Sequence, residues 1–138
     1  MSPEIYQITD GLPGSLFIMP CPSGDTLNRD VDAYRARGVD VVVSMLAIDE
    51  AAMLGLSDEA DACQRAGISF IHSPIPDFGL PDASIFARLV EQIVQMLKDG
   101  KAVAVHCRAG IGRSGMVTSG ALIALGVDAQ NAVKQVTA

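Results

Sequence analysis

The chain has 138 residues, a length that fits one domain spanning residues 1–138. Apolar residues make up 49% of the composition and charged residues 19%, which excludes a disordered chain. The formal net charge of −6 argues against non-specific nucleic-acid binding, because such binding needs a basic surface. A small local basic site, such as a phosphate pocket, is compatible with this charge.

Cysteine usage and the apolar segments predict a cytoplasmic protein without a membrane partner. Cys21, Cys63 and Cys107 are an odd number without the spacing of a disulfide scaffold, which indicates a reducing compartment. The N-terminal residues MSPEIYQITDG lack the basic and apolar regions of a secretory signal. The most apolar late stretch, 116–127, is too short to span a bilayer.

In the first half of the chain, short apolar runs alternate with amphipathic stretches. This pattern is typical of an α/β domain with a central, mostly parallel sheet flanked by helices on both faces. Turn residues, cap residues and β-branched runs predict the following elements: a hairpin of 5–8 with 15–19, a helix from Asp25 or Thr26 to Arg37 ended by Gly38, a buried strand at 39–45, a helix start at Asp49 and Glu50, a helix from Ser57 through Ala66 ended by Gly67, and a strand at 68–73.

The second half begins with a loop, 74–81 (PIPDFGLP), whose three prolines and one glycine require a defined shape. Asp82 then caps a helix that Gly100 ends. Its apolar residues recur with the helical period and predict one buried face: Ile85, Phe86, Leu89, Val90, Ile93, Val94 and Leu97. We expect a central strand at 102–106, a loop at 107–112, a helix from Arg113 to Gly126 with Met116 and Leu122 in the core, and a short helix after Asp128.

The most informative segment is 106–115, HCRAGIGRSG, between the predicted central strand and the helix that follows it. A loop in this position can direct several backbone N–H groups at one anion, helped by the positive end of the helix dipole. Gly110 and Gly112 allow the close backbone approach that such a loop needs. The loop residues 108–112 (Arg108, Ala109, Gly110, Ile111 and Gly112), together with Arg113, are therefore the predicted phosphate-binding residues.

Three side chains of this segment carry the predicted chemistry. The dipoles that attract the anion also stabilise the thiolate of Cys107, which makes it a nucleophile. Arg113, six residues on, offers two parallel hydrogen bonds to phosphate oxygens, which a lysine cannot match. The hydroxyl of Ser114 can bond to the Cys107 sulfur and stabilise it as a leaving group. Cys-x5-Arg alone is a weak signal, but the accompanying His, Gly and Ser-Gly residues favour a functional loop over a structural one.

The segment HCRAGIGRSG resembles the His-Cys-x5-Arg-Ser/Thr signature of the protein tyrosine and dual-specificity phosphatase superfamily. From about Ser15 onward, the layout is most similar to the small cyclin-dependent-kinase-associated (atypical dual-specificity) branch and its bacterial relatives. In that branch a Pro-Ile-x-Asp segment lies about thirty residues before the cysteine, and here Pro74-Ile75-Pro76-Asp77 does so. The resemblance implies that Asp77 is the general acid, which also suits a carboxyl group on a loop beside the pocket. The alternative for Asp77 is a turn residue.

The implied mechanism has two steps and requires no metal or cofactor. Cys107 attacks phosphorus while Asp77 protonates the leaving oxygen, and Asp77 then activates the water that hydrolyses the cysteinyl-phosphate. Arg113 and the loop amides stabilise the equatorial oxygens. The leading functional hypothesis is hydrolysis of phosphotyrosine in proteins, with phosphoserine and phosphothreonine as further substrates. The alternatives are a phosphatase for phosphoinositides or small phosphorylated metabolites, and a phosphate-binding module with weak turnover.

Several further residues are open to a functional and a structural interpretation. The resemblance implies that His106 is buried, orients the loop and tunes Cys107; a general-base role is the alternative, and one His-Cys pair lacks the ligands of a zinc site. His72 is interpreted as a strand-end residue and Cys63 as part of a helix core. Cys21 is a candidate redox partner of Cys107, and Asp49 or Glu50 a candidate acidic residue near the pocket. Relatives usually continue past the position of Ala138 with a basic segment, so we expect the domain to be short at its C-terminus.

Overall fold

The computed structural model describes residues 6–7, 14–74, 83–107 and 112–126. The described elements, in chain order, are β1 Tyr6–Gln7, β2 Ser15–Pro20, the 3₁₀ turn η1 Gly24–Thr26, α1 Leu27–Ala36, β3 Val41–Ser44, α2 Ile48–Met53, α3 Glu59–Arg65, β4 Ser69–His72, α4 Ala83–Lys98, β5 Ala102–Cys107 and α5 Gly112–Ala124. This order alternates strands and helices, as the sequence predicts for an α/β domain.

The described strands form one sheet in the order β1-β2-β5-β3-β4. Strands β2, β5, β3 and β4 run parallel, and β1 pairs with β2 in the antiparallel direction. The predicted mostly parallel sheet and the predicted N-terminal hairpin are therefore confirmed. Because β5 lies between β2 and β3, the strand that carries Cys107 is central and both of its edges are hydrogen-bonded.

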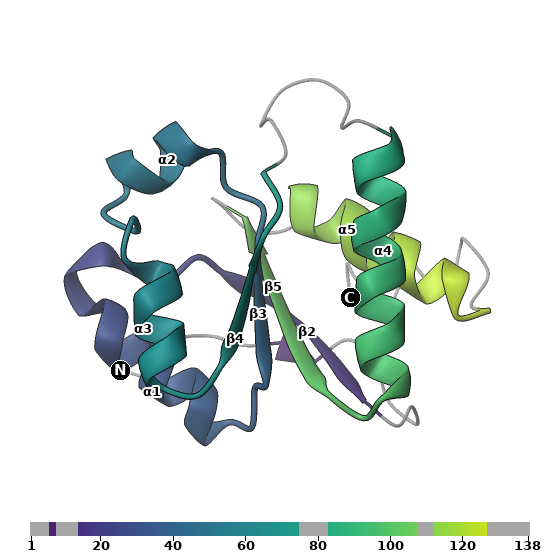
Figure 1. Cartoon of the computed structure of the whole chain (residues 1–138), viewed down its shortest axis with the longest axis horizontal. Coiled ribbons are helices and arrows are strands. Elements are labelled where there is room, and N and C mark those ends of the chain that lie inside the picture. Colours follow the sequence, from purple (N-terminus) through teal and green to yellow (C-terminus); the bar gives the residue numbers. More distant parts are fainter. Residues whose placement is uncertain (1–5, 8–13, 75–82, 108–111, 127–138) are drawn as a thin grey trace.

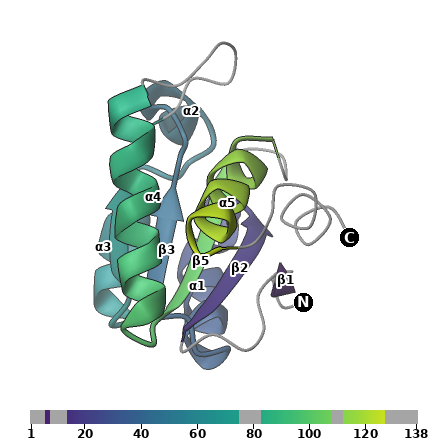
Figure 2. The ribbon, with the colours of Figure 1, turned by 90° about the vertical axis from the view of Figure 1, so that its right-hand side faces the viewer.

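Helices cover both faces of the sheet, with α1 and α3 on one face and α4 and α5 on the other (Figures 1 and 2). Alternate residues of the strands feed two separate apolar cores, because successive side chains of a strand point to opposite faces. Val103, Val105 and Cys107 pack with α4 and α5. Ala104 packs with residues of α1 and α3. This alternation decides on which side of the sheet each site residue lies.

Most helix boundaries agree with the sequence. The predicted glycine stops at Gly38, Gly67, Gly100 and Gly126 all have positive φ, the conformation for which glycine has no steric penalty. The residue before α3 is Asp58, whose side chain makes no capping hydrogen bond, so the predicted cap at Ser57 is wrong. The segments 75–82 and 127–138, which include the predicted caps Asp82 and Asp128, lie outside the described residues.

The helix surfaces depart from prediction at two apolar residues. Along α4, Leu89, Val90, Ile93 and Leu97 are buried as predicted, but Ile85 in the first turn is 51% exposed. In α5, Leu122 is buried, whereas Met116 is 38% exposed and is not the core residue we expected. In both helices the apolar pattern thus includes a residue that the neighbouring elements leave exposed.

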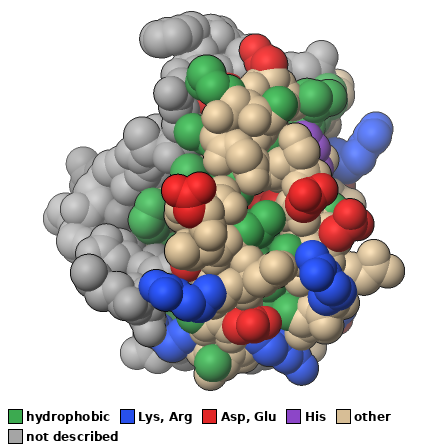
Figure 3. Space-filling view, turned by 90° about the vertical axis from the view of Figure 1, so that its left-hand side faces the viewer, with side chains coloured by type: hydrophobic (Ala, Val, Ile, Leu, Met, Phe, Trp, Pro, Cys, Tyr) green, Lys and Arg blue, Asp and Glu red, His purple; other side chains and the backbone are tan. Residues whose placement is uncertain are grey.

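The face formed by α1, α2 and α3 carries acidic and basic side chains interspersed with neutral ones (Figure 3). This view contains no large patch of one charge among the described residues. Within the described residues, no helix combines the length and the apolar composition needed to cross a bilayer.

Candidate active site

The predicted nucleophile, Cys107, is the last residue of β5. The strand is one residue longer than predicted, because Pro20 of β2 still pairs with Cys107. The Cys107 side chain is only 3% exposed and belongs to the core that packs against α4 and α5. The thiol is therefore fixed on the α4 and α5 side of the sheet, at the carboxyl end of the central strand.

The helix expected after the signature loop begins at Gly112, only five residues after Cys107. A short connection of this kind keeps the first turn of α5 close to the end of β5, with the positive end of the helix dipole at that edge of the sheet. The backbone of Arg113 and Ser114 lies in this first turn. The predicted phosphate-binding residues Arg108, Ala109, Gly110 and Ile111 lie outside the described residues.

The segment that contains Asp77 also lies outside the described residues, but its two flanks are described. Strand β4 ends at His72 and α4 begins at Ala83. Figure 1 shows both of these ends at the edge of the sheet where β5 also ends. Carboxyl ends of parallel strands are where open α/β sheets hold their ligands, so the flanks are compatible with a general acid at Asp77.

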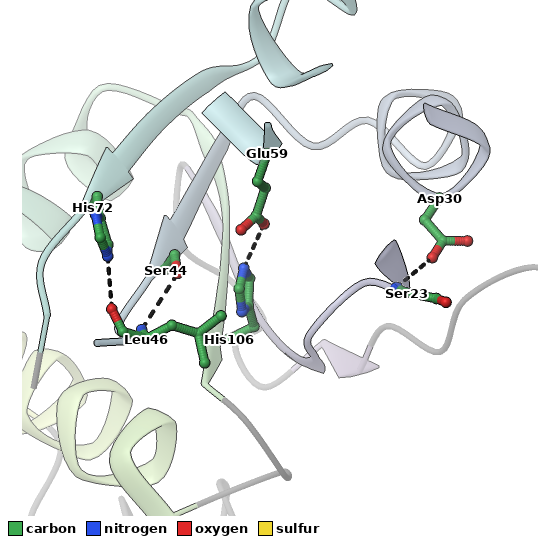
Figure 4. Close-up of polar contacts among 7 residues, drawn as sticks. All are labelled: Ser23, Asp30, Ser44, Leu46, Glu59, His72 and His106. Carbon is green, nitrogen blue, oxygen red and sulfur yellow. Dashed lines mark hydrogen bonds and ion pairs between the residues drawn. The ribbon is translucent and has the colours of Figure 1, made fainter. Parts of the chain in front are cut away.

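His106 lies on the opposite face of the sheet from the Cys107 side chain, because the two are successive residues of β5. Its side chain is fully buried, as predicted. The backbone carbonyl of His106 accepts a hydrogen bond of 3.1 Å from the backbone N–H of Met45. The imidazole Nε2 lies 2.6 Å from Oε2 of Glu59 at the start of α3 (Figure 4). The residue that precedes Cys107 is thus held by both its backbone and its side chain.

Sequence reasoning did not identify Glu59 as a partner of the site. An acidic residue in the first turn of a helix is common because it interacts favourably with the helix dipole, and this explanation suffices for Glu59 in the sequence. Its side chain is only 3% exposed, and its partner His106 lies 47 residues further along the chain. Only the packing of α3 against the back of the sheet brings the two together.

The other residues considered from the sequence take structural positions. His72 is at the end of β4, as predicted, and its Nε2 lies 2.7 Å from the backbone carbonyl of Leu46. Cys63 is fully buried in α3, as predicted, and burial together with nearby Glu59 raises the pKa of its thiol to about 12. Glu50 is buried and accepts a 3.0 Å hydrogen bond from the backbone N–H of Ala47, so it caps α2.

Cys21 follows directly after β2, the strand that pairs with β5. Its side chain packs against the core on the α1 and α3 side, whereas Cys107 belongs to the core on the α4 and α5 side. This placement on opposite faces disfavours direct contact between the two thiols. Among the described residues, no group of three or more His, Cys, Asp or Glu side chains is arranged to hold a metal ion.

A cavity of about 230 Å³ lies behind the site, between α2, α3 and β4. Its polar lining comes from Ser44, Ser57, Glu59 and His72. A larger hollow of about 440 Å³ lies over η1, the start of α1 and α3, and includes Asp25, Arg29, Asp58 and Arg65. Its charges are of both signs, which does not suit selective binding of a phosphate dianion.

Comparisons with known proteins agree with this architecture. A family model described as "Polymorphic toxin system, DSP-PTPase phosphatase" matches residues 19–127. Cyclin-dependent kinase inhibitor 3 of Rattus norvegicus is 28% identical over 99 residues, which are 72% of this chain and 47% of the rat protein. The chain therefore spans about half the length of the curated relatives it matches.

Solved structures show the same fold. A crystal structure of kinase-associated phosphatase, with its catalytic-site cysteine substituted by serine, superposes with a TM-score of 0.86 at 20% identity. The match covers 98% of this chain and 82% of that one. Tk-PTP in its active form superposes with a TM-score of 0.76 at 28% identity, covering 99% of this chain and 84% of that one.

Proposed function

The chain belongs to the DSP-PTPase phosphatase family, and we propose that it hydrolyses phosphotyrosine in proteins through a cysteinyl-phosphate at Cys107. The observation that carries the proposal is the position of Cys107, a buried thiol at the carboxyl end of the central strand. The signature HCRAGIGRSG spans this strand end and the first turn of α5. A thiol beside the backbone amides of a helix start is activated as a nucleophile, and this expected arrangement supports the proposal.

In the first step, the Cys107 thiolate forms a sulfur–phosphorus bond as the bond between phosphorus and the ester oxygen breaks. Asp77 donates its proton to that oxygen, so the alcohol or phenol leaves neutral. Arg113 and the loop amides bind the three equatorial oxygens, on which charge accumulates in the transition state. In the second step, Asp77 removes a proton from water, and the water oxygen bonds to phosphorus as the sulfur–phosphorus bond breaks, which releases inorganic phosphate. Ser114 donates a hydrogen bond to the departing thiolate.

The loop composition supports a protein substrate or a small anion over a phosphoinositide. Between Cys107 and Arg113 the loop contains one basic residue, Arg108, and no lysine. A headgroup with several phosphates needs further cations beside the one that binds the reacting phosphate. The overall charge of −6 also disfavours attraction to an anionic lipid surface.

The test is rapid-mixing kinetics with an aryl phosphate, followed by a panel of phosphotyrosine and phosphoserine peptides, a phosphoinositide and a sugar phosphate. We expect a burst of phenol release equal to the enzyme concentration, and the highest kcat/KM on phosphotyrosine peptides. Cys107→Ser should abolish the burst but keep phosphate binding, while Cys21→Ser, the matched thiol control, should leave both unchanged. A wild-type protein that binds phosphate without a burst is a binding module, and a preference for lipid or sugar phosphate would overturn the substrate assignment.

A further inference from the structure

A buried acid–base pair lies directly behind the strand that ends at Cys107. The side chains of His106 and Glu59 are 0% and 3% exposed, and Nε2 and Oε2 are 2.6 Å apart. This distance is at the short end for nitrogen–oxygen hydrogen bonds and is typical of a charge-assisted bond. Figure 4 shows Glu59 reaching from the start of α3 toward the imidazole ring on β5.

The Glu59–His106 pair is linked to Cys107 through the backbone of β5. His106 precedes Cys107 in a central strand whose two edges are both paired. The backbone carbonyl of His106 accepts a hydrogen bond from the backbone N–H of Met45, and its ring is hydrogen-bonded to Glu59 of α3. The residue before Cys107 is therefore held by both its backbone and its side chain. A charge on the ring is therefore held in a fixed position one residue before Cys107, on the opposite face of the sheet from the Cys107 side chain.

The proton count of the pair follows from its burial. An ionised Glu59 beside a neutral ring would leave one buried negative charge without a cation, since among the described residues no Lys or Arg lies within ion-pair distance of Glu59. Such a charge is far more costly than one hydrogen-bonding group without a partner. The alternative is a Glu59–His106 pair with no net charge. In this pair one proton lies in the hydrogen bond between Nε2 and Oε2, and a second proton is bound to Nδ1. Nδ1 has no hydrogen-bond partner within the described residues. The free-energy cost of this unpaired N–H group is smaller than the cost of a buried carboxylate without a cation.

From this geometry we propose that Glu59 is a positioning residue that keeps the His106 ring doubly protonated, so that a positive charge lies behind the Cys107 thiolate. The proposal rests on the proposed function, in which that thiolate is the nucleophile. A cationic neighbour stabilises a thiolate, whereas a lone buried carboxylate would repel it. In this arrangement Glu59 acts only through His106 and touches neither the substrate nor the reacting sulfur.

Other titratable groups surround the pair, and they do not obscure its effect. Tyr34 of α1 and Cys63 of α3 lie near Glu59, and His72 of β4 lines the same cavity as Glu59; Asp30 and Cys21 act on Tyr34. Burial raises the pKa of Tyr34 far above its usual range, with Asp30 and Glu59 adding to the effect, and Cys63 is likewise a neutral thiol near pH 7. Since all these groups are present in wild type and variant alike, a difference between the two proteins reports on Glu59.

The decisive experiment measures the rate at which iodoacetamide alkylates Cys107 between pH 5 and pH 9, read by peptide mass spectrometry. Glu59→Gln keeps the shape and a hydrogen-bonding oxygen but removes the charge that holds the second proton on the ring. We expect the midpoint pH of alkylation to rise by up to about one unit, because the ring that loses its charge is adjacent to Cys107 in the chain, whereas the carboxylate that is lost with it lies behind the ring. Asp58→Asn, which removes an exposed charge one residue earlier, is the matched control and should leave the midpoint unchanged.

Each result has a distinct meaning. A midpoint that falls in Glu59→Gln shows that Glu59 is a lone anion, and an unchanged midpoint shows a purely structural contact; either result overturns the proposal. If wild-type Cys107 itself reacts only at the pH of an ordinary thiol, the proposed function fails instead. A second measurement needs no substitution: the ¹⁵N shifts of His106 in the wild-type protein should show protons on both ring nitrogens at pH 7, and a bare Nδ1 would refute the inference.

Discussion

Removal of the His106 ring tests the energetics of the buried pair independently of any chemistry at Cys107. In His106→Ala the Glu59 carboxylate, whose side chain is 3% exposed, loses the cation within its reach. Breaking a buried ion pair by removal of one partner costs about 3–5 kcal/mol, because the remaining charge is uncompensated. We therefore expect the free energy of unfolding to fall by about this amount at pH 8. Since small domains are stable by only about 5–15 kcal/mol, the variant should remain folded but with a much lower urea midpoint.

The pH dependence and a double variant separate the charge from the loss of packing. In His106→Ala the folded protein binds a proton at Glu59 more tightly than the unfolded chain does, so the stability of the variant rises as the pH falls. The deficit should thus be smaller at pH 5 than at pH 8. His106→Ala combined with Glu59→Gln removes both the cation and the anion, and should lose less than the single variant, about 1–3 kcal/mol for an amide with an incomplete set of hydrogen bonds.

Urea unfolding followed by circular dichroism at both pH values gives all three quantities. A single variant that is no less stable than the double variant, with a deficit independent of pH, would mean that Glu59 is not charged in the folded protein. In that case the ring of His106 would contribute only packing, and the assignment of a positive charge to the position behind Cys107 would be wrong.

Three further predictions concern the phosphate-binding Arg113, the general acid Asp77 and the glycine that precedes β2. Arg113→Lys should lower kcat/KM nearly as much as Arg113→Ala, because neither variant keeps the bidentate fork, and near wild-type activity of the lysine variant would contradict the clamp. Asp77→Asn should lower the rate of hydrolysis of a phosphotyrosine peptide about 10²–10⁴-fold, and that of an activated aryl phosphate much less. Asp82→Asn is the control, and equal losses of rate on both substrates would exclude Asp77 as the general acid. Gly14→Ala should lower the free energy of unfolding by about 1–3 kcal/mol, because the new Cβ would lie 2.4 Å from the carbonyl oxygen of Lys101. Gly120→Ala is the control, because the atom nearest to its new Cβ is a side-chain methyl of Val90 at 3.2 Å, and thermal unfolding should show that this substitution is tolerated.

The fold class and the family can both be inferred from the amino-acid sequence alone. Buried parallel strands have continuous β-branched runs, such as 41–43, and the helices between them end at glycines, so the alternation of elements is visible in the residue pattern. The signature 106–115 is local in the chain, and its chemistry follows from residues that are adjacent in sequence. For this reason the sequence suffices to predict that Cys107 lies where the central strand meets the following loop, although it places Cys107 in the loop and the structure extends the strand to include it.

The identity of the residue behind the nucleophile depends instead on long-range packing. Glu59 and His106 lie 47 positions apart in the chain, and nothing in the local pattern of either one specifies the other. Their contact depends on the strand order, which puts β5 beside β3, and on the packing of α3 against that face of the sheet. The exposure of Ile85 and Met116 has the same origin, because a helical period gives the direction of an apolar face, while the neighbouring elements decide how much of it they cover.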